Sequence, residues 1–513
     1  MNLTLEQLTY IAERGPKALS AVAGSGKTTT MVEDVRLRKV EEPNATILCV
    51  AFNKKIALTL EERMPKGVEC KTMHSLGMRA WNRVVPRDIK VETNKTWKLW
   101  GDIAPESDED DDRKSLFLDV KRLVGLLKGA GAIPPAARAT HGGCRPLGDW
   151  ANRNWRLSLL DFLDEHEFDL ELQARDDVIE LATKLLEESI ITSFDGVIDF
   201  DDMLYMPVCF GGKFNSFDRV MIDEAQDIND IQRAMLHMVL RPGGTLCAVG
   251  DPYQAIYAFR GANHNSFNLI IEEFGLKTFP LSCSFRCPIE VVKLAQRIVP
   301  HITWNPAAEA GSVTSLPNFG PNVFTPDDAV ICRNTKPLVF LAFSLLRNGV
   351  ACFINGSDIG ASLNALIRRL KAKSLPDLEE RLRMWEQNEI ARLTKRGSDA
   401  AIEVVSDKAA TIRAVIDGVA SEIPDATISD VTAQIKRLFS DPGSRRLTLS
   451  TIHRSKGLEW QRVFILDRHL MPSRYATSAA ALQQEANLEY VAITRAMREL
   501  YFITSDSFDK EPE

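Results

Sequence analysis

The stretch Ala21–Thr28, which reads AVAGSGKT, constrains this chain more than any other feature of its sequence. Gly24 and Gly26 stand where backbone N–H groups can close around phosphate oxygens, and the Lys27 ammonium can reach the terminal phosphates of a nucleotide. The hydroxyl of Thr28 can hold Mg²⁺. The stretch therefore predicts a phosphate-binding loop. Its first position holds alanine where the usual pattern has glycine, so a second element has to support the prediction.

The segment 220–227, VMIDEAQD, is that second element. An apolar run delivers Asp223 and Glu224 at its C-terminal end, which is where open α/β sheets place their ligands. One carboxylate can orient Mg²⁺ while the next polarises an attacking water, as phosphoryl transfer requires. The alternative is an acidic strand-to-helix turn without chemistry, and the phosphate loop disfavours it.

Short apolar runs bounded by turn residues alternate with helical patterns such as Lys54–Met64 and Ile231–Leu240. Such alternation predicts βα units with buried parallel strands. A chain of 513 residues is too long for one core, so we expect two or more domains of the α/β class. The predicted strands are residues 45–52, 218–223, 244–250, 328–333, 447–451 and 462–467.

Two mainly helical stretches, residues 90–200 and 356–440, lie between the strand clusters and look like insertions into α/β domains. The first carries the acidic run Asp108–Asp112, which we expect to be a solvated loop rather than a metal cage or a protein-binding tail. The second carries residues 378–393, whose spacing predicts an amphipathic helix within a small helical subdomain.

Composition narrows the class of protein further. No apolar run approaches the roughly 18 to 20 residues that cross a bilayer, so no membrane partner is expected. Acidic residues interrupt the N-terminus, so we expect no signal peptide and an intracellular protein: cytoplasmic and nucleoid-associated if bacterial or phage, nuclear if eukaryotic. Nine cysteines, several in apolar runs, predict no disulfide framework. The net charge of −7 argues against nucleic-acid binding over the whole surface but allows a basic channel.

The ordered motifs resemble the superfamily 1 DNA helicases of the UvrD/Rep type over residues 3–504. Blocks similar to the Q motif, Walker A, motifs Ia and Ib, the segment ahead of Walker B, Walker B and motif III are LTLEQ (3–7), AVAGSGKT (21–28), ILCVAFNKKIALTLEERM (47–64), CKTMHSLGMR (70–79), DFDDML (199–204), DEAQD (223–227) and VGDPYQAIYAFRGA (249–262). Blocks similar to motifs IV, V and VI are LSCSFRCP (281–288), TIHRSKGLEW (451–460) and EANLEYVAITRA (485–496). The wording leans toward the branch that contains the F-box DNA helicase and its phage and bacterial relatives.

The resemblance implies two RecA-like P-loop motor domains with parallel sheets, each interrupted by a mainly helical insertion. The first motor domain is expected over residues 1–90 and 200–280 with its insertion at 91–199, and the second over 281–355 and 441–513 with a short insertion at 356–440. The second insertion is short beside the large regulatory subdomain of the family, so autoinhibition is expected to be weaker or differently arranged. No fused nuclease is expected after motif VI.

The resemblance also implies roles at an ATP site. Gln7 would hydrogen-bond the adenine edge, Phe285 would stack on its face, and Glu459 would contact the ribose. The remaining ATP-binding residues would be Ala23, Gly24, Ser25, Gly26, Lys27, Thr28 and Thr29, with Thr28 and Asp223 holding Mg²⁺. The catalytic residues would be Glu224 as the base, Gln254 as the sensor of the γ-phosphate and its attacking water, and Arg286 and Arg495 as arginine fingers from the second motor domain.

DNA contacts follow from the same motifs. The aromatic candidates for stacking on bases are Phe52, Tyr257 and Phe259. The candidates for backbone contact are Asn53, Lys54, Thr72, His74, Arg260, Arg333 and His453. Core packing is the alternative for Phe52 and Tyr257, and a hydrogen-bonded bridge between motifs is the alternative for His74 and His453.

Two departures from the family pattern affect these expectations. Thr29 stands where the family often has arginine directly after GKT, which removes an expected contact on the adenine side. Ala486 and Asn487 stand where an arginine pair is common in motif VI, which removes an expected ion pair between domains.

The sequence therefore predicts an ATP-dependent DNA helicase that moves 3′→5′ on single-stranded DNA and unwinds tailed duplexes in DNA repair, recombination or replication. Two alternatives stay open: a translocase that strips proteins from single strands without much unwinding, and a nucleotide-gated DNA-binding subunit of a larger complex. No residue excludes RNA as a substrate, and no protein partner is indicated.

Overall fold

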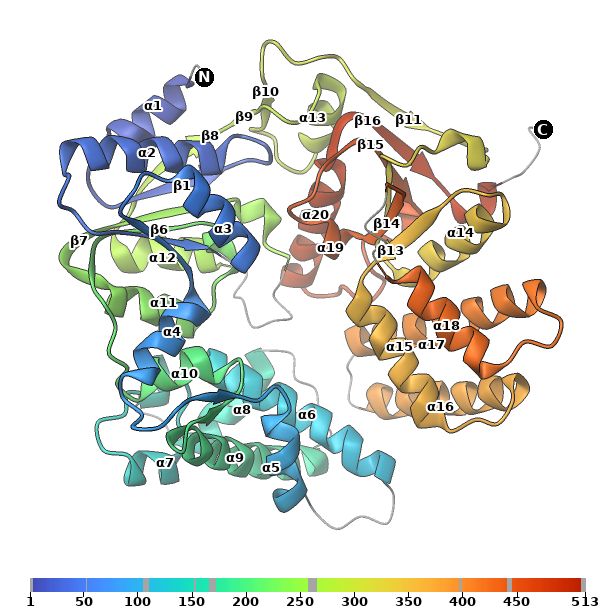
Figure 1. The fold of residues 1–513 in the computed structure, drawn as a ribbon, viewed down its shortest axis with the longest axis horizontal. Coiled ribbons are helices and arrows are strands. Elements are labelled where there is room, and N and C mark those ends of the chain that lie inside the picture. The colour runs from blue at the N-terminus through green and yellow to red at the C-terminus, as the bar shows by residue number, and fades with distance from the viewer. Residues whose placement is uncertain are drawn as a thin grey trace. The chain divides into compact units, whose positions relative to one another are not determined.

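The computed structural model describes residues 3–51, 53–104, 110–151, 154–165, 172–256, 265–395, 399–440 and 445–508. The chain divides into two compact units. The first comprises Met1–Ala21 and Gly26–Leu281, and the second comprises Val22–Ser25 and Ser282–Glu513. Each unit is built on its own parallel sheet of six strands (Figure 1).

The sheet of the first unit has the strand order β3-β2-β6-β7-β1-β8, and every pairing in it is parallel. Its strands are β1 (Lys17–Ala21), β2 (Ile47–Ala51), β3 (Val68–Thr72), β6 (Phe217–Ile222), β7 (Leu240–Gly250) and β8 (Lys277–Leu281). The helices around it are α1 (Leu5–Ala12), α2 (Lys27–Glu41), α3 (Lys54–Arg63), α4 (Met73–Asn82), α10 (Asp202–Cys209), α11 (Asp230–Val239) and α12 (Ser266–Phe274).

Helices cover both faces of this sheet because its strands are apolar on both sides. Ile47 and Cys49 of β2 pack into one core with side chains of α1, α2 and α3. Leu48 and Val50, which point the opposite way, pack into a second core with side chains of α4, α10, α11 and α12. The run of buried residues in β2 is what a parallel strand covered on both faces requires.

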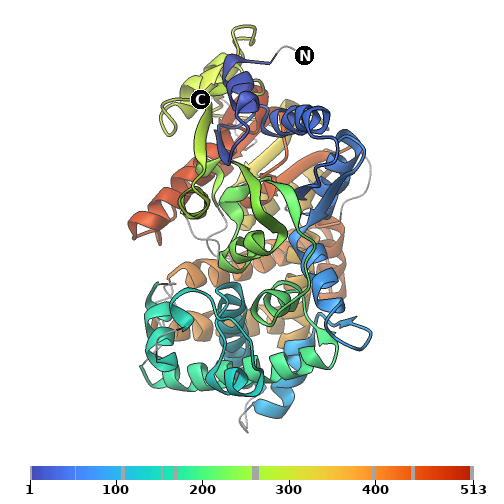
Figure 2. The same ribbon diagram turned by 90° about the vertical axis from the view of Figure 1, so that its left-hand side faces the viewer.

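The second of these cores continues into the helical segment between β3 and β6 (Figure 2). That segment contains α5 (Lys95–Ile103), α6 (Asp110–Gly129), α7 (Pro135–Thr140), α8 (Trp155–Glu165), α9 (Leu172–Phe194) and a short parallel pair, β4 (Lys90–Val91) with β5 (Val197–Ile198). The expected solvated loop at the acidic run is wrong for its last three residues, because α6 begins at Asp110. Carboxylates are favourable at a helix N-terminus, which carries a partial positive charge.

The sheet of the second unit has the order β11-β16-β15-β12-β14-β13, again with parallel pairings throughout. Its strands are β11 (Ser312–Ser315), β12 (Ala329–Cys332), β13 (Cys352–Asn355), β14 (Leu447–Thr451), β15 (Trp460–Leu466) and β16 (Ala496–Ile503). Helices of this unit include α13 (Ile289–Ala295), α14 (Thr335–Arg347), α15 (Ser357–Leu370), α16 (Leu375–Lys395), α17 (Asp399–Glu422), α18 (Ile428–Leu438), α19 (Ile452–Ser455) and α20 (Ala479–Ile493).

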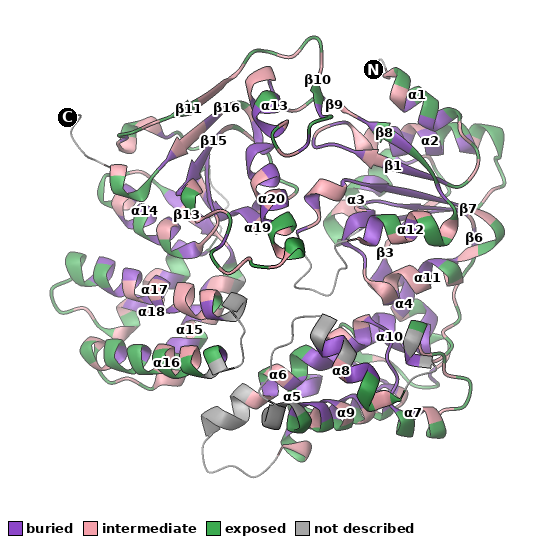
Figure 3. Cartoon of the chain, turned by 180° about the vertical axis from the view of Figure 1, so that it is seen from behind, coloured by how far each residue is buried: buried purple, intermediate pink, exposed green. Residues whose placement is uncertain are grey.

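One core runs from the second sheet into helices α14 to α18. The predicted amphipathic helix is α16, which buries Leu378 and Leu382. In both units the strands are largely buried while the outward faces of the helices are exposed (Figure 3). Among the described residues, no helix is both long enough and apolar enough to cross a membrane.

Candidate nucleotide and nucleic-acid site

The phosphate-binding loop connects β1 to α2, as the motif requires. Gly24 has φ +72° and Gly26 has φ +83°, a left-handed backbone that glycine adopts without strain. Ser25 closes the turn, since its hydroxyl donates to the carbonyl of Val22 at 2.8 Å. Gly26 caps α2 without a side chain, so the N-terminal N–H groups of the helix are left for a ligand.

The acidic pair lies at the C-terminal end of β6, next to this helix start. Lys27 Nζ lies 3.7 Å from Glu224 Oε1. The hydroxyl of Thr28 hydrogen-bonds the carboxylate of Asp223, which is buried. The structure therefore brings Lys27, Thr28, Asp223 and Glu224 together within the first unit, as the sequence predicts.

The electrostatics of this pair favour a cation. Burial, together with the neighbouring charge of Glu224, raises the pKa of Asp223 to about 7, although Lys27 and the Thr28 hydroxyl act in the opposite direction. Two adjacent carboxylates with one lysine are undercompensated in a buried setting, which a divalent ion would relieve. The hydroxyl of Thr28 and the carboxylate of Asp223 are the hard oxygen donors that Mg²⁺ takes alongside substrate phosphates. The residues fit the ion, and no group of three or more His, Cys, Asp or Glu side chains in the described part of the chain forms another metal site.

Glu224 is held by a residue that sequence reasoning missed, Gln226. The Gln226 amide donates to Glu224 Oε2 at 2.5 Å and accepts from the backbone N–H of Asp251 at 3.1 Å. Asp251 in turn accepts from the side-chain amide of Gln254 at 2.7 Å. The candidate base and the candidate γ-phosphate sensor are thus connected by one chain of hydrogen bonds. The motif lettering DEAQD and GDPYQ contains both connecting residues, but their partners depend on the fold.

Gln7 lies against the start of α2. Its amide oxygen accepts from the N–H of Thr4 at 2.9 Å, and its amide nitrogen donates to Thr30 Oγ1 at 3.0 Å. Thr30 Oγ1 donates to the carbonyl of Gly26 at 3.0 Å. Gln7 therefore fixes α1 to the turn of the phosphate loop, whatever it also contributes to adenine.

Thr29, the position that departs from the family pattern, contacts an arginine from another element. Arg63, the last residue of α3, donates from Nη2 to Thr29 Oγ1 at 3.2 Å. The sequence gave no signal for this contact, because the two residues belong to different motifs.

The second unit gathers four other candidates at the ends of its motifs. Arg286 Nε lies 2.6 Å from Glu459 Oε2, and Arg286 Nη1 donates to the carbonyl of Thr494 at 3.4 Å. Arg495 is 1% exposed and donates to the carbonyls of Val491 and Leu458. The pairing of Arg286 with Glu459 was not expected from the separate roles that the motifs imply.

Residues Val22–Ser25 group with this second unit, and two of its candidates contact them. The N–H of Ala23 donates to the hydroxyl of Tyr490 at 2.9 Å. The N–H of Phe285 donates to the carbonyl of Gly24 at 2.9 Å, while the Phe285 ring is exposed. Tyr490 is a residue of motif VI that sequence reasoning did not single out.

The predicted strand contacts of the first unit follow two neighbouring parallel strands. Asn53 caps α3 by accepting from the N–H of Ile56 at 2.9 Å, and exposed Lys54 is the first residue of that helix. Thr72 caps α4 by accepting from the N–H of Ser75 at 3.2 Å. Since β2 and β3 are paired, both helix starts lie at one edge of the sheet.

His74, in the first turn of α4, forms a ring contact with Phe200 at 4.6 Å between centroids. Burial lowers the pKa of His74, so the ring is neutral near pH 7. Phe200 is 58% exposed, which is unusual for phenylalanine and makes it a further candidate for contact with a base. The predicted contacts Phe52, Tyr257, Phe259 and Arg260 lie outside the described residues.

The two strand candidates of the second unit sit in different settings. Arg333 follows β12 and lies 2.9 Å from Glu485 and 3.6 Å from Glu403, so two carboxylates face its guanidinium. His453 lies half-buried in the short helix α19.

Comparison with known proteins gives family matches to both parts of the chain. Residues 3–275 match the model of the UvrD/REP helicase N-terminal domain, and residues 371–507 match that of the UvrD-like helicase C-terminal domain. The F-box DNA helicase protein 1 of Schizosaccharomyces pombe is 26% identical over 96% of this chain and 56% of its own length. A putative ATP-dependent DNA helicase of Bacillus subtilis, YjcD, is 24% identical over 98% of this chain and 78% of its own length. UvrD2 of Mycobacterium tuberculosis, an ATP-dependent DNA helicase, is 23% identical over 95% of this chain and 76% of its own length. The chain thus spans little more than half of the first of these relatives and about three quarters of the other two.

Proposed function

The chain belongs to the UvrD/Rep helicase family, and from that premise we propose that it is an ATP-dependent DNA helicase that moves 3′→5′ along single-stranded DNA. The observation that carries the proposal is the cluster of Lys27, Thr28, Asp223 and Glu224 at the C-terminal edge of the first sheet. A chain that only bound nucleotide would have no need of a carboxylate held in place by a second side chain, as Glu224 is held by Gln226.

Each residue of this cluster has a part in hydrolysis. The N–H groups at the start of α2 and the ammonium of Lys27 bind the phosphates. Thr28 and Asp223 would hold Mg²⁺, which when bound neutralises charge on the β- and γ-phosphates. Glu224 accepts a proton from the attacking water, and Gln254 orients that water against the terminal phosphate. Gln226 keeps the carboxylate of Glu224 aimed while the site is empty of substrate.

The second unit supplies the remaining roles in this proposal. Arg286 and Arg495 neutralise the charge that develops on the transferred phosphoryl group. Arg286 has the better access for this role, because it is paired with the exposed carboxylate of Glu459, whereas Arg495 is buried and donates to carbonyls of its own unit. The exposed ring of Phe285 stacks on adenine, Gln7 contacts the adenine edge, and Glu459 contacts the ribose.

Strand contact is assigned to the edge of the first sheet where α3 and α4 begin. Asn53, Lys54 and Thr72 contact the backbone there, since such contacts position a strand without reading its sequence. Phe200 stacks on a base beside His74, a role that suits its exposed ring. We propose that the protein serves DNA repair, recombination or replication.

The experiment that tests this function is ATP-driven strand displacement on matched duplexes that carry either a 3′ or a 5′ single-stranded tail. Opening of the 3′-tailed duplex alone is the expected result, and the matched control is Glu224→Gln, which should bind ATP and strand but not hydrolyse. A preference for the 5′ tail would refute the polarity. Hydrolysis stimulated by single strands without displacement on either duplex would refute the helicase and favour the protein-stripping translocase.

A further inference from the structure

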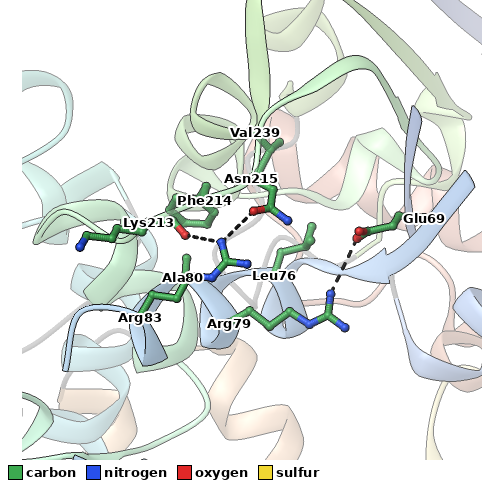
Figure 4. A pocket seen from close by; sticks show the side chains of 9 residues that line it. All are labelled: Glu69, Leu76, Arg79, Ala80, Arg83, Lys213, Phe214, Asn215 and Val239. Carbon is green, nitrogen blue, oxygen red and sulfur yellow. Dashed lines mark hydrogen bonds and ion pairs between the residues drawn. The ribbon is translucent and has the colours of Figure 1, made fainter. Parts of the chain in front are cut away.

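A small basic hollow opens on the surface of the first unit between α4 and the segment 211–216 (Figure 4). Its volume is about 20 Å³, and its wall carries three cationic side chains, Arg79, Arg83 and Lys213, against one carboxylate, Glu69. A local excess of positive charge is notable in a chain whose net charge is −7. The hollow is separate from the nucleotide site, and none of its residues belongs to the cluster around Lys27.

The cations of the hollow are available to a ligand. Arg79 Nη1 lies 3.7 Å from Glu69 Oε2, which is longer than a hydrogen bond, and the Arg79 side chain is 55% exposed. Arg83 is anchored from one side: its Nη1 donates to the carbonyl of Lys213 at 3.0 Å and to Asn215 Oδ1 at 2.8 Å. Within the described ranges no carboxylate forms an ion pair with Arg83, so its Nε and Nη2 remain for an anion.

The floor of the hollow is apolar. Leu76 and Val239 are buried beneath it, and Phe214 is half-buried at its side. Apolar walls lower the local dielectric constant and strengthen the attraction of the cations for an anion. A planar guanidinium held by carbonyl oxygens on one side is a preorganised donor for two oxygens of a phosphate group.

The same helix joins the hollow to the proposed strand contacts. Thr72 caps α4 and His74 lies in its first turn, while Arg79 lies roughly 10 Å further along the helix axis at 1.5 Å per residue. Arg79 and Arg83 are four residues apart, so both side chains lie on one face of α4. This face offers a continuous path from the helix start to the hollow.

We propose that this hollow binds a backbone phosphate of single-stranded DNA and extends the strand-binding surface along α4, away from the helix start. The proposal rests on the proposed function, since it requires that a strand contacts Thr72 and His74. A carboxylate of an acidic peptide shares part of the chemistry of a phosphate. Continuity with the strand contacts on α4 favours nucleic acid.

The test measures the affinity of oligothymidines of increasing length, from about 4 to about 16 nucleotides, the range of known single-strand sites, as a function of salt. The variant is Arg79→Ala/Arg83→Ala. The matched control is Arg87→Ala/Arg156→Ala, which removes two exposed arginines of the same unit that are paired with Asp195 and Asp176. Arg79→Glu is a second variant, because its only ion pair, with Glu69 at 3.7 Å in the described part of the chain, contributes little to folding.

The variant should bind the long strands about 10-fold to 100-fold more weakly than the control, which is what loss of hydrogen bonds to a charged group costs. The slope of log affinity against log salt should fall by about 0.7 for each lost phosphate contact on the long strands. The shortest strands should bind equally to variant and control.

Three results would overturn the proposal. Equal affinity and equal salt slopes for the variant and the control at every length would refute the role of the hollow and leave the proposed function intact. Binding of polyglutamate by the wild type but not by Arg79→Glu, with strand binding unchanged, would assign the hollow to an acidic peptide. A wild type that binds no strand of any length would refute the proposed function itself, and the hollow with it.

Discussion

The buried ion network between the helical segment and α10 gives the sharpest stability prediction for this fold. Lys128 of α6 is 1% exposed, and its Nζ lies 2.7 Å from Asp202 Oδ1, 2.8 Å from Asp199 Oδ2 and 3.0 Å from Ser189 Oγ. Burial alone would raise the pKa of Asp202, but the charges of Lys128 and Lys95 hold it well below its ordinary value. The change to test is Lys128→Met, which keeps the apolar stem and removes the charge.

The magnitude follows from what the change leaves behind. Removing one partner of a buried ion pair costs about 3–5 kcal/mol, because the remaining charge loses its compensation without regaining water. Lys95 still lies 2.7 Å from Asp202 Oδ2 in the variant, which supports the lower end, about 3 kcal/mol. The matched control is Lys184→Met in α9. Lys184 is exposed and pairs with Glu180 at 2.7 Å, so its loss should cost less than about 1 kcal/mol.

Urea unfolding followed by tryptophan fluorescence measures the difference. Trp81 and Trp100 are buried in the same core as α6 and α9, and the Trp81 indole donates to the carbonyl of Ser193 at 3.4 Å. The fluorescence transition should move to lower urea in Lys128→Met without a change in its slope. A loss below about 1 kcal/mol, no larger than that of the control, would refute the claim that the network is desolvated and mutually dependent.

Two predictions concern activity. Gln226→Ala should lower kcat for ATP hydrolysis by about 100-fold with little change in KM, because a misaligned base is costly while phosphate binding is unaffected; steady-state kinetics measure this, and an unchanged kcat would remove Gln226 from the positioning of Glu224. Phe200→Ala should weaken single-strand binding by about 1–3 kcal/mol if the ring stacks on a base, as fluorescence anisotropy with labelled oligothymidine would show. Wild-type affinity in a folded Phe200→Ala variant would return that ring to a purely structural role.

The strands could be predicted from sequence because burial on both faces makes a parallel strand a plain apolar run. The predicted run 447–451 coincides with β14, and the run 218–223 lies within one residue of β6 at each end. The strand β7 begins four residues earlier than the predicted start at 244. Its first residues, Leu240–Gly243, contain proline and glycine, which weaken any strand signal, and only the fold supplies their partner in β6.

The phosphate cluster could also be predicted, and for a geometric reason. In a parallel sheet the loops after each strand meet at one edge, so a phosphate loop after β1 and an acidic pair after β6 have to lie close together. The connections through Gln226 could not be predicted, because an amide side chain has several possible partners and the choice depends on packing at the ångström scale. The same holds for Arg63 and Thr29, which only the packing of α3 against α2 brings together.

Long charged side chains are the hardest to assign from sequence, and Arg333 shows why. The motif context makes it a candidate for contact with a DNA phosphate, but the structure surrounds it with Glu485 at 2.9 Å and Glu403 at 3.6 Å. Glu485 is itself fixed by the N–H of Ser473 at 3.0 Å. For Arg333 to contact a phosphate, it would have to share or give up a partly buried ion pair, and leaving a buried carboxylate without its partner is costly. Asn53 and Thr72 face no such cost, since each caps a helix start at the sheet edge. Strand contact is therefore energetically easier at the edge of the first sheet than at Arg333.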